Sequence, residues 1–259
     1  MNKIPNTYFP IFEWTEPKTA IMGGFSLDKE KMNCQHQYLS YLEKLSQFIK
    51  VIYFANDEHK KEIQSQINCS KINFVNYELN SIWIRDYAPI WLQCRKSSAF
   101  LLANFPYGAN HFGKNEQDDG FSSILSEFVD MPLRLDFPRK QIPYYFDGGN
   151  IFVDEDLNCF TAIRKDDPPE EYRRKLLSNI NCNKVVIMDA IPGEGTGHVD
   201  TFMKILPNKI ALLAKYNLPD FNHEMSKNKM KLTDLGYDVF EIKHSDVEGQ
   251  TNWSYLNSA

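Results

Sequence analysis

The chain has 259 residues, of which 42% are hydrophobic and 24% charged, a composition that excludes disordered and fibrous proteins. Its formal net charge is −5, with 34 acidic residues against 29 scattered basic ones, so the sequence does not predict binding to nucleic acid. No apolar run approaches the ~20 residues that cross a bilayer, and no apolar signal segment is visible at the start, so we expect a cytoplasmic protein without a membrane partner.

Strand-like and helix-like runs alternate along the chain, and the alternation repeats with a period of roughly 55 residues. The predicted elements of the first unit are strand 19–25, helix 36–50, strand 51–54, a short helix from Asp57 and strand 72–75. Those of the second unit are strands 81–92 and 99–105, a helix through 121–128 and strand 133–135.

The third and fourth units follow the same order. The predicted elements of the third are strands 145–154 and 159–164, a helix capped by Asp167, and strand 184–188. Those of the fourth are strands 197–206 and 209–216, a helix that ends at Gly236, and strand 238–242. The landmarks of successive units, at spacings of 64, 51 and 55 residues, are Trp83, Asp147, His198 and Trp253. No linker separates the units, so we expect one α/β domain over residues 1–259, with an incomplete fifth unit that opens near Trp253.

The cysteines give no sign of a metal site. They are odd in number and widely spaced, without a CxxC pair or a Cys/His cluster: Cys34, Cys69, Cys94, Cys159 and Cys182. We therefore expect reduced thiols and no zinc.

Three short segments at the starts of units could carry chemistry. In the first, Trp83 precedes Asp86, and a carboxylate beside an aromatic face suits a planar cation. In the second, Asp147 precedes two glycines that allow close approach of a ligand to the backbone. In the third, His198 and Asp200 are two apart in a strand-like run, which would point both side chains the same way. Taken singly, the segments fit equally well a structural ion pair, a turn and a core histidine.

Taken together, the segments place Asp86, Asp147, His198 and Asp200 at equivalent ends of three repeated units. In a cyclic arrangement these ends converge on one axis. A pocket with three carboxylates and one imidazole would bind a cation, and it suits a guanidinium better than a metal ion because a second metal-type ligand is missing.

The segments WIRDYAP, FDGGNIFVD and GHVDTF, in this order, resemble the agmatine deiminase and Porphyromonas-type peptidyl-arginine deiminase family, and the resemblance runs from about Phe9 to the end of the chain. It implies the five-bladed pentein α/β-propeller of strand-strand-helix-strand repeats, here with the fifth repeat truncated. It also implies hydrolysis of a guanidino group without a metal or organic cofactor, on a small guanidino substrate or an arginine side chain.

The resemblance also implies roles for individual residues. Asp86 and Asp200 would bind the guanidinium, and Trp83 would help to line their pocket. His198 would be the general acid and base. Asp147 stands where the agmatine branch usually has Glu, and it would hold the substrate or the histidine. A cysteine thiolate would attack the guanidinium carbon, and water would cleave the resulting thiouronium intermediate.

The nucleophile is where the chain departs from the family. The family's cysteine lies in the fifth repeat, whereas this sequence ends at Ala259 before such a segment, and neither Cys94 nor Cys159 stands at a matching place. We therefore expect the 259-residue chain to lack thiol-dependent deiminase activity. An incomplete propeller would leave open strand edges, which favour association such as a homo-oligomer.

Two alternatives to an enzyme remain at this point: a pentein-like module that binds a guanidino or amine ligand, and a structural protein with vestigial motifs. The substrate is also open between agmatine and free or peptidyl arginine. A free arginine would need a basic partner for its carboxylate, for which Arg85, Arg95 and Arg164 are candidates. We place agmatine first because a small intracellular substrate fits the absence of a secretion signal.

Overall fold

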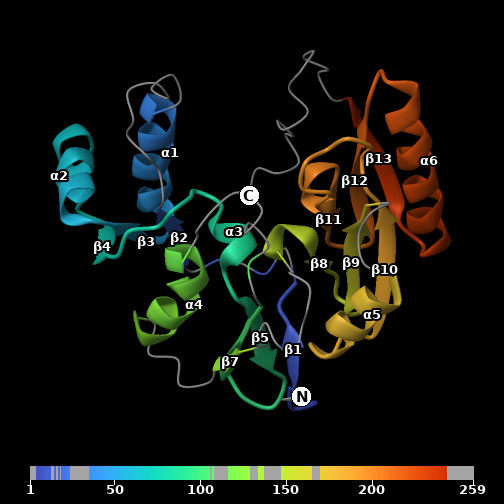
Figure 1. Cartoon of the computed structure of the whole chain (residues 1–259), viewed down its shortest axis with the longest axis horizontal. Helices are drawn as coiled ribbons and strands as arrows, with labels where there is room; N and C mark the ends of the chain where they lie inside the picture. Colours follow the sequence, from blue (N-terminus) through green and yellow to red (C-terminus); the bar gives the residue numbers. More distant parts are fainter. Residues whose placement is uncertain are drawn as a thin grey trace.

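The computed structural model describes residues 4–12, 15, 17, 19–23, 35–105, 107, 116–128, 134–136, 147–164 and 170–243. Within these ranges the chain forms a mixed α/β fold with four small sheets, which confirms the predicted fold class. In Figure 1 the sheets lie around the middle of the molecule, with helices α1 (Gln35–Phe48), α2 (Asp57–Gln66) and α6 (Pro219–Asp234) on the outside. The predicted cap Asp167 and the landmark Trp253 lie outside the described residues.

The first sheet contains β2 (Thr19–Gly23), β3 (Lys50–Ala55) and β4 (Ile72–Asn76). All its strands are parallel, because α1 and α2 carry the chain back between them. Asn56 caps α2 by accepting a hydrogen bond from the His59 backbone N–H at 2.9 Å. The order of elements is the one predicted for the first unit.

The other three units share one topology: an antiparallel hairpin, an outer helix and a third strand parallel to the second. The second unit contains β5 (Ile90–Cys94), β6 (Phe100–Asn104), α4 (Glu116–Phe128) and β7 (Arg134–Asp136). The third contains β8 (Phe152–Val153), β9 (Asn158–Ile163), α5 (Glu170–Ser178) and β10 (Lys184–Asp189). The fourth contains β11 (Met203–Leu206), β12 (Ile210–Lys215), α6 and β13 (Asp238–Lys243). Gly236 follows α6 with φ of +82°, as expected for a residue that ends a helix.

The structure corrects the predicted start of each of these three units. The segments predicted as opening strands begin with single helical turns, namely α3 (Ile84–Tyr87), η3 (Gly148–Asn150) and η4 (Val199–Thr201). Each turn is preceded directly by a landmark residue and followed, after one or two further residues, by the first strand of the hairpin. The landmarks of these units are therefore equivalent in structure, although they do not lie in strands.

Buried apolar clusters join neighbouring units. One packs Phe54 of β3 with Tyr87 of α3 and Phe121 of α4, and another packs Leu92 of β5 with Val153 of β8. A third packs the third unit against the fourth, between β9 and the hairpin of β11 and β12. Each interface removes apolar surface from water, which stabilises the fold by ~25 cal/mol per Å² buried. The units therefore hold one another in place, and this fixes the positions of the three turns.

Two pairings within the fold were not predicted from the sequence. The strand β1 (Tyr8–Pro10) adds to the second unit by antiparallel pairing with β5. Cys159 and Cys182 form a disulfide with Cα atoms 5.8 Å apart, so the expectation of five reduced thiols is wrong for this pair. The sequence does not reveal this contact, because the two cysteines are 23 residues apart. The contact forms because the parallel pairing of β9 with β10 puts Cys159 opposite Val185, close to Cys182 in the chain.

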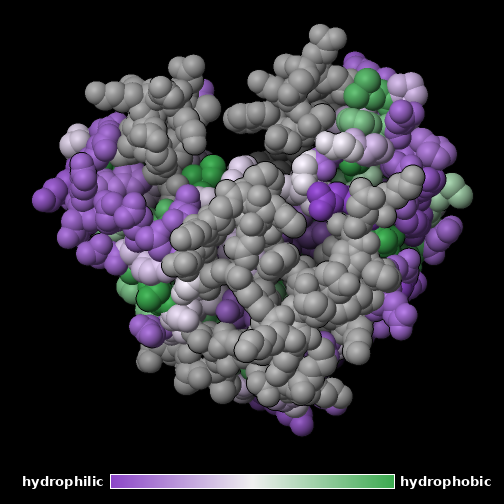
Figure 2. All heavy atoms as spheres, viewed as in Figure 1, coloured by the Kyte–Doolittle hydropathy of each residue, from purple (hydrophilic) through white to green (hydrophobic). Residues whose placement is uncertain are grey.

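Among the residues that the structure places, no helix is long and apolar enough to cross a membrane. Figure 2 shows an almost uniformly hydrophilic surface on the flank where α2 lies. This matches a helix in which Ile63 is buried against β3 while charged residues face outward.

Candidate functional site

The three single turns bring the candidate residues together, although these come from three separate units. Asp86 lies in α3, Asp147 directly before η3, His198 directly before η4, and Asp200 within η4. The first direct link is between α3 and η3, where the Gly149 backbone N–H donates to Asp86 Oδ1 at 3.1 Å. Figure 1 shows α3 near the centre of the molecule, on the inner side of the sheets.

Gly149 lies at the point where the candidate side chains meet. A Cβ atom at this position would be 2.3 Å from Asp86 Oδ1, and 2.8 Å from both Asp200 Oδ2 and His198 Nδ1. Any side chain would therefore displace these groups, and the glycine is required by close approach. The sequence predicted close approach of a ligand to the backbone of these glycines, and this stays a prediction. The structure shows that the backbone at Gly149 approaches the candidate side chains themselves.

His198 is held between two carboxylates. Its Nε2 is 3.1 Å from Asp147 Oδ2, and its Nδ1 is 3.5 Å from Asp86 Oδ1. Burial by itself lowers the pKa of His198, but the hydrogen bond to Asp147 and the charges of Asp86 and Asp147 outweigh it and raise the pKa to about 9. The imidazole is therefore protonated at neutral pH and can donate a proton.

Asp200 is buried and incompletely paired. Its Oδ2 is 3.6 Å from Arg85 Nε, whereas its Oδ1 is buried without a hydrogen-bond partner among the described residues. Arg85 is anchored elsewhere as well, because its guanidinium donates to the Ile151 carbonyl at 3.3 Å and lies 5.3 Å from the centre of the Phe152 ring. One carboxylate oxygen therefore remains available for a donor that comes from outside the chain.

The two carboxylates that flank Gly149 are harder to ionise than ordinary aspartates. Burial raises the pKa of Asp86 to about 6 and that of Asp200 to about 7, although the positive charge of His198 opposes both shifts. A cation placed between them would favour their ionised forms. The electrostatics of the free site are therefore those of a site built for a positively charged ligand.

Two residues with supporting positions were not singled out from the sequence. Glu194 is buried, and its carboxylate accepts hydrogen bonds from the Thr196 N–H at 3.1 Å, from the Thr196 hydroxyl at 2.8 Å and from the Gly197 N–H. Thr196 Oγ1 in turn accepts from the His198 N–H at 3.2 Å, so Glu194 organises the loop that leads to the histidine. Asn150 accepts from the Val199 N–H at 3.1 Å and bonds both backbone groups of Ala162. The one signal in the sequence for these roles is position: Asn150 ends the segment FDGGN, and Glu194 lies in the segment GEGTGH.

Trp83 occupies the predicted position before α3, and its side chain is 54% exposed. Its carbonyl accepts from the Asp86 N–H at 2.9 Å, which helps to close the turn. The ring is therefore available to a ligand, and its role in lining a pocket stays a prediction.

The described cysteines have partners away from His198. Cys159 and Cys182 are joined to each other, Cys69 contacts the Ile67 carbonyl, and Cys94 lies beside Ser97 at the end of β5. Cys34 lies outside the described residues. In the part of the chain that the structure covers, no group of three His, Cys, Asp or Glu side chains is arranged to hold a metal ion.

These features define the chemical capacity of the site. Three carboxylates and one arginine surround a protonated imidazole, giving a formal charge of −1 when all of them are ionised. A ligand with several N–H donors and a positive charge would fill the open acceptor on Asp200. A proton donor stands beside the same position.

Comparisons with known proteins identify a family and a fold for the chain. The family model described as Porphyromonas-type peptidyl-arginine deiminase matches residues 12–258. The fold is similar to that of agmatine deiminase from C. jejuni, with a TM-score of 0.78 and 18% identity over 97% of this chain and 79% of that one. It is also similar to agmatine deiminase of Enterococcus faecalis, with a TM-score of 0.79 and 15% identity over 92% of this chain and 71% of that one. A search of the curated proteins found no match.

Proposed function

Because the chain belongs to the Porphyromonas-type peptidyl-arginine deiminase family, we propose that its site binds a guanidino compound for hydrolysis to a ureido product and ammonia. The reaction would convert agmatine to N-carbamoylputrescine, or arginine, free or in a peptide, to citrulline. We also propose that residues 1–259 form one domain.

One observation carries this proposal: in the part of the chain that the structure describes, the buried Oδ1 of Asp200 has no hydrogen-bond partner, and it belongs to a cluster with Asp86 and His198 around Gly149. An unpartnered buried acceptor costs about 1–3 kcal/mol, more when it is charged. A cluster with this cost is explained by a ligand that supplies the missing donors.

The proposed roles follow from the contacts. Asp86 and Asp200 would accept N–H groups of the guanidinium, and the exposed ring of Trp83 would cover its flat face. Binding would release the protons that the free site holds on Asp86 and Asp200 at pH 6 to 7. The guanidinium carbon would then be fixed beside the His198 imidazole.

The chemistry would proceed by addition and elimination at this carbon. A thiolate sulfur forms a bond to the carbon, and His198, whose pKa of about 9 keeps it protonated, gives its proton to the departing nitrogen. Ammonia leaves and a thiouronium remains. A water molecule then adds to the carbon and loses one proton to His198. The carbon–sulfur bond breaks to return the thiolate, and the remaining hydroxyl proton is lost to solvent as the ureido carbonyl forms. Asp147 would keep His198 oriented through both steps.

The thiolate is the component that the described residues do not bring to the site. Cys159 and Cys182 are joined in the disulfide, and neither Cys69 nor Cys94 has His198 among its contacts. We therefore expect the 259-residue polypeptide to bind guanidino ligands without forming a ureido product. A colorimetric ureido assay and an ammonia assay check this, and either product above the background of H198A would refute it.

Agmatine is the substrate that the charges favour. The three arginines considered as partners for a substrate carboxylate are engaged or distant. Arg85 contacts Asp200, Arg164 donates to the Gly195 carbonyl at 2.7 Å, and Arg95 lies after the end of β5 that is remote from the α3 turn. Free arginine would bring its carboxylate to a site that already carries three, whereas agmatine has none.

Calorimetric titration at pH 8 tests the proposal. We expect agmatine to bind wild-type protein more tightly than free arginine, and D86N and D200N each to weaken agmatine binding at least tenfold. The matched control D238N changes an exposed aspartate in β13 and should bind like wild type. Equal agmatine affinity in D86N, D200N and D238N would refute the proposed site.

A further inference from the structure

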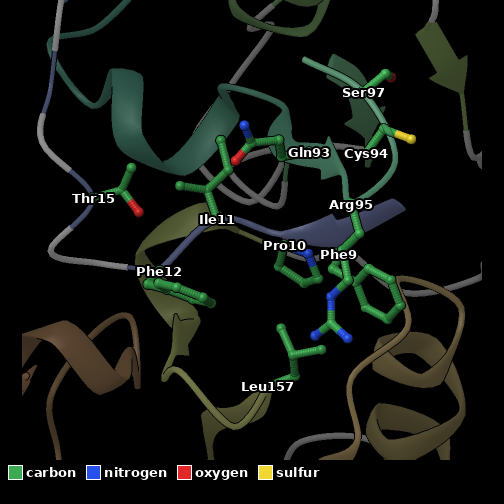
Figure 3. Close-up of a pocket in the computed structure, with 10 residues that line it drawn as sticks. All are labelled: Phe9, Pro10, Ile11, Phe12, Thr15, Gln93, Cys94, Arg95, Ser97 and Leu157. Atoms are coloured by element: carbon green, nitrogen blue, oxygen red, sulfur yellow. The ribbon is translucent and has the colours of Figure 1, made fainter. Parts of the chain in front are cut away.

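A second pocket lies between the amino-terminal segment and two hairpin ends. Its volume is about 330 Å³, within the range of small-molecule sites. Segment 9–12 and Thr15 form one wall, residues 93–95 and 97 of the β5–β6 hairpin form another, and Leu157 closes it from the β8–β9 hairpin (Figure 3). The pocket exists because β1 adds to β5, the pairing that the repeat pattern did not predict.

This pocket is separate from the candidate site of Asp86 and His198. The α3 turn precedes β5 at Ile90, whereas the pocket begins at Gln93 near the other end of that strand. At ~3.3 Å per residue, the five-residue strand puts roughly 13 Å between its two ends. None of the residues that line the pocket belongs to the three turns.

Arg95 gives the pocket its charge. It is the one charged side chain among the described residues that line it, and no ion pair among the described residues includes it. Its guanidinium carbon lies 3.9 Å from the centre of the Phe9 ring, which holds the planar group in one orientation. Figure 3 shows the guanidinium beside the Phe9 ring, with its terminal nitrogens toward Leu157.

The apolar part of the lining is made by segment 9–12 and Leu157. Pro10 and Leu157 are buried, and Ile11 and Phe12 are partly buried beside them. The remaining lining side chains are small or polar, namely Thr15, Gln93, Cys94 and Ser97. A ligand of this pocket therefore combines one negative group for Arg95 with an apolar body for the walls. A single arginine suits a monoanionic carboxylate better than a phosphate dianion, because its one positive charge neutralises a carboxylate and leaves a dianion with an uncompensated negative charge.

We propose that this pocket is a binding site for a small organic carboxylate with an aromatic or short aliphatic body, distinct from the guanidino site. The carboxylate pairs with the Arg95 guanidinium, and the body packs on Ile11 and Phe12. The site is independent of the proposed hydrolysis and selects the opposite charge.

Phenylacetate is the probe, and phenylacetamide is its uncharged counterpart of the same shape. Calorimetry on the full chain at pH 7.5 should show phenylacetate binding at least tenfold more tightly than phenylacetamide. R95Q should weaken phenylacetate binding at least tenfold and leave phenylacetamide unchanged. K96Q removes the neighbouring exposed charge outside the pocket and should bind like wild type.

Further measurements separate local from general effects. I11A trims the apolar wall and should weaken both probes by a similar factor of about three to ten. Circular dichroism of R95Q and I11A should match wild type, because both side chains lie at the surface or are only partly buried. Saturating agmatine should leave phenylacetate affinity unchanged. Equal affinity for the two probes, loss of phenylacetate binding in K96Q equal to that in R95Q, or displacement by agmatine would overturn the proposal.

Discussion

Replacing Asp200 by asparagine should make the protein more stable while it abolishes guanidino binding. This carboxylate is buried, and among the residues that the structure places its Oδ1 has no hydrogen-bond partner, while its Oδ2 is 3.6 Å from Arg85 Nε. Burial raises its pKa from the ordinary 3.8 to about 7. Asparagine has nearly the same shape as the protonated acid and avoids the burial of a charge.

The size of the effect follows from the pKa shift. One pKa unit corresponds to ~1.4 kcal/mol, so at pH 8, above both pKa values, the shift destabilises the folded wild type by about 4 kcal/mol. D200N also loses the charge attraction to the partly exposed Arg85 side chain, and this loss offsets ~0–1 kcal/mol of the gain. We therefore expect D200N to raise the free energy of unfolding by roughly 3 kcal/mol at pH 8.

The dependence on pH has a definite sign. The folded protein keeps the Asp200 proton between pH 4 and 7, where the unfolded chain has lost it, so wild type loses stability as the pH rises through this window. D200N does not share this loss. Its advantage should shrink to less than about 1 kcal/mol at pH 5 and vanish near pH 4.

Urea unfolding of wild type and D200N at pH 5 and pH 8, with and without agmatine, measures these differences. Excess agmatine should stabilise wild type at pH 8 and leave D200N unchanged. A D200N variant that is less stable than wild type at both pH values would refute the reasoning, because Asp200 would then be a structural group. An advantage that does not change with pH would refute the assigned titration.

Three further predictions concern the same cluster. G149A should weaken agmatine binding at least tenfold and destabilise the fold by about 1–3 kcal/mol, because the added Cβ would lie 2.3 Å from Asp86 Oδ1; calorimetry and urea unfolding measure both, and wild-type behaviour would contradict the close approach. The His198 imidazole should titrate in NMR with a pKa of about 9, and D147N should lower that pKa toward 6.5, whereas an unchanged value would exclude Asp147 as its partner. Agmatine affinity should rise by roughly three orders of magnitude from pH 5 to pH 8 and then level off, because Asp86 and Asp200 with pKa values of about 6 and 7 must both lose protons; a flat profile would exclude their ionisation as the linked event.

The sequence by itself determined the repeated architecture of the protein. Local signals predicted individual elements: helical spacing for α1 and α4, apolar runs for β3 and β10, and a glycine for the end of α6. These signals repeat along the chain because each unit buries the same face, which imposes the same pattern. The three motifs were recognised for the same reason, since Trp83, Asp147 and His198 recur at one position of the unit.

The tertiary structure alone decided how these residues meet. His198 and Asp200 were expected on one face of a strand, but η4 turns them toward Gly149 through a helical turn, because the backbone must bend before β11 begins. The pKa values depend on burial and on charges from other units, which spacing along one chain does not encode. The Cys159–Cys182 disulfide, the addition of β1 to β5 and the loop support from Glu194 likewise arise from contacts between distant segments.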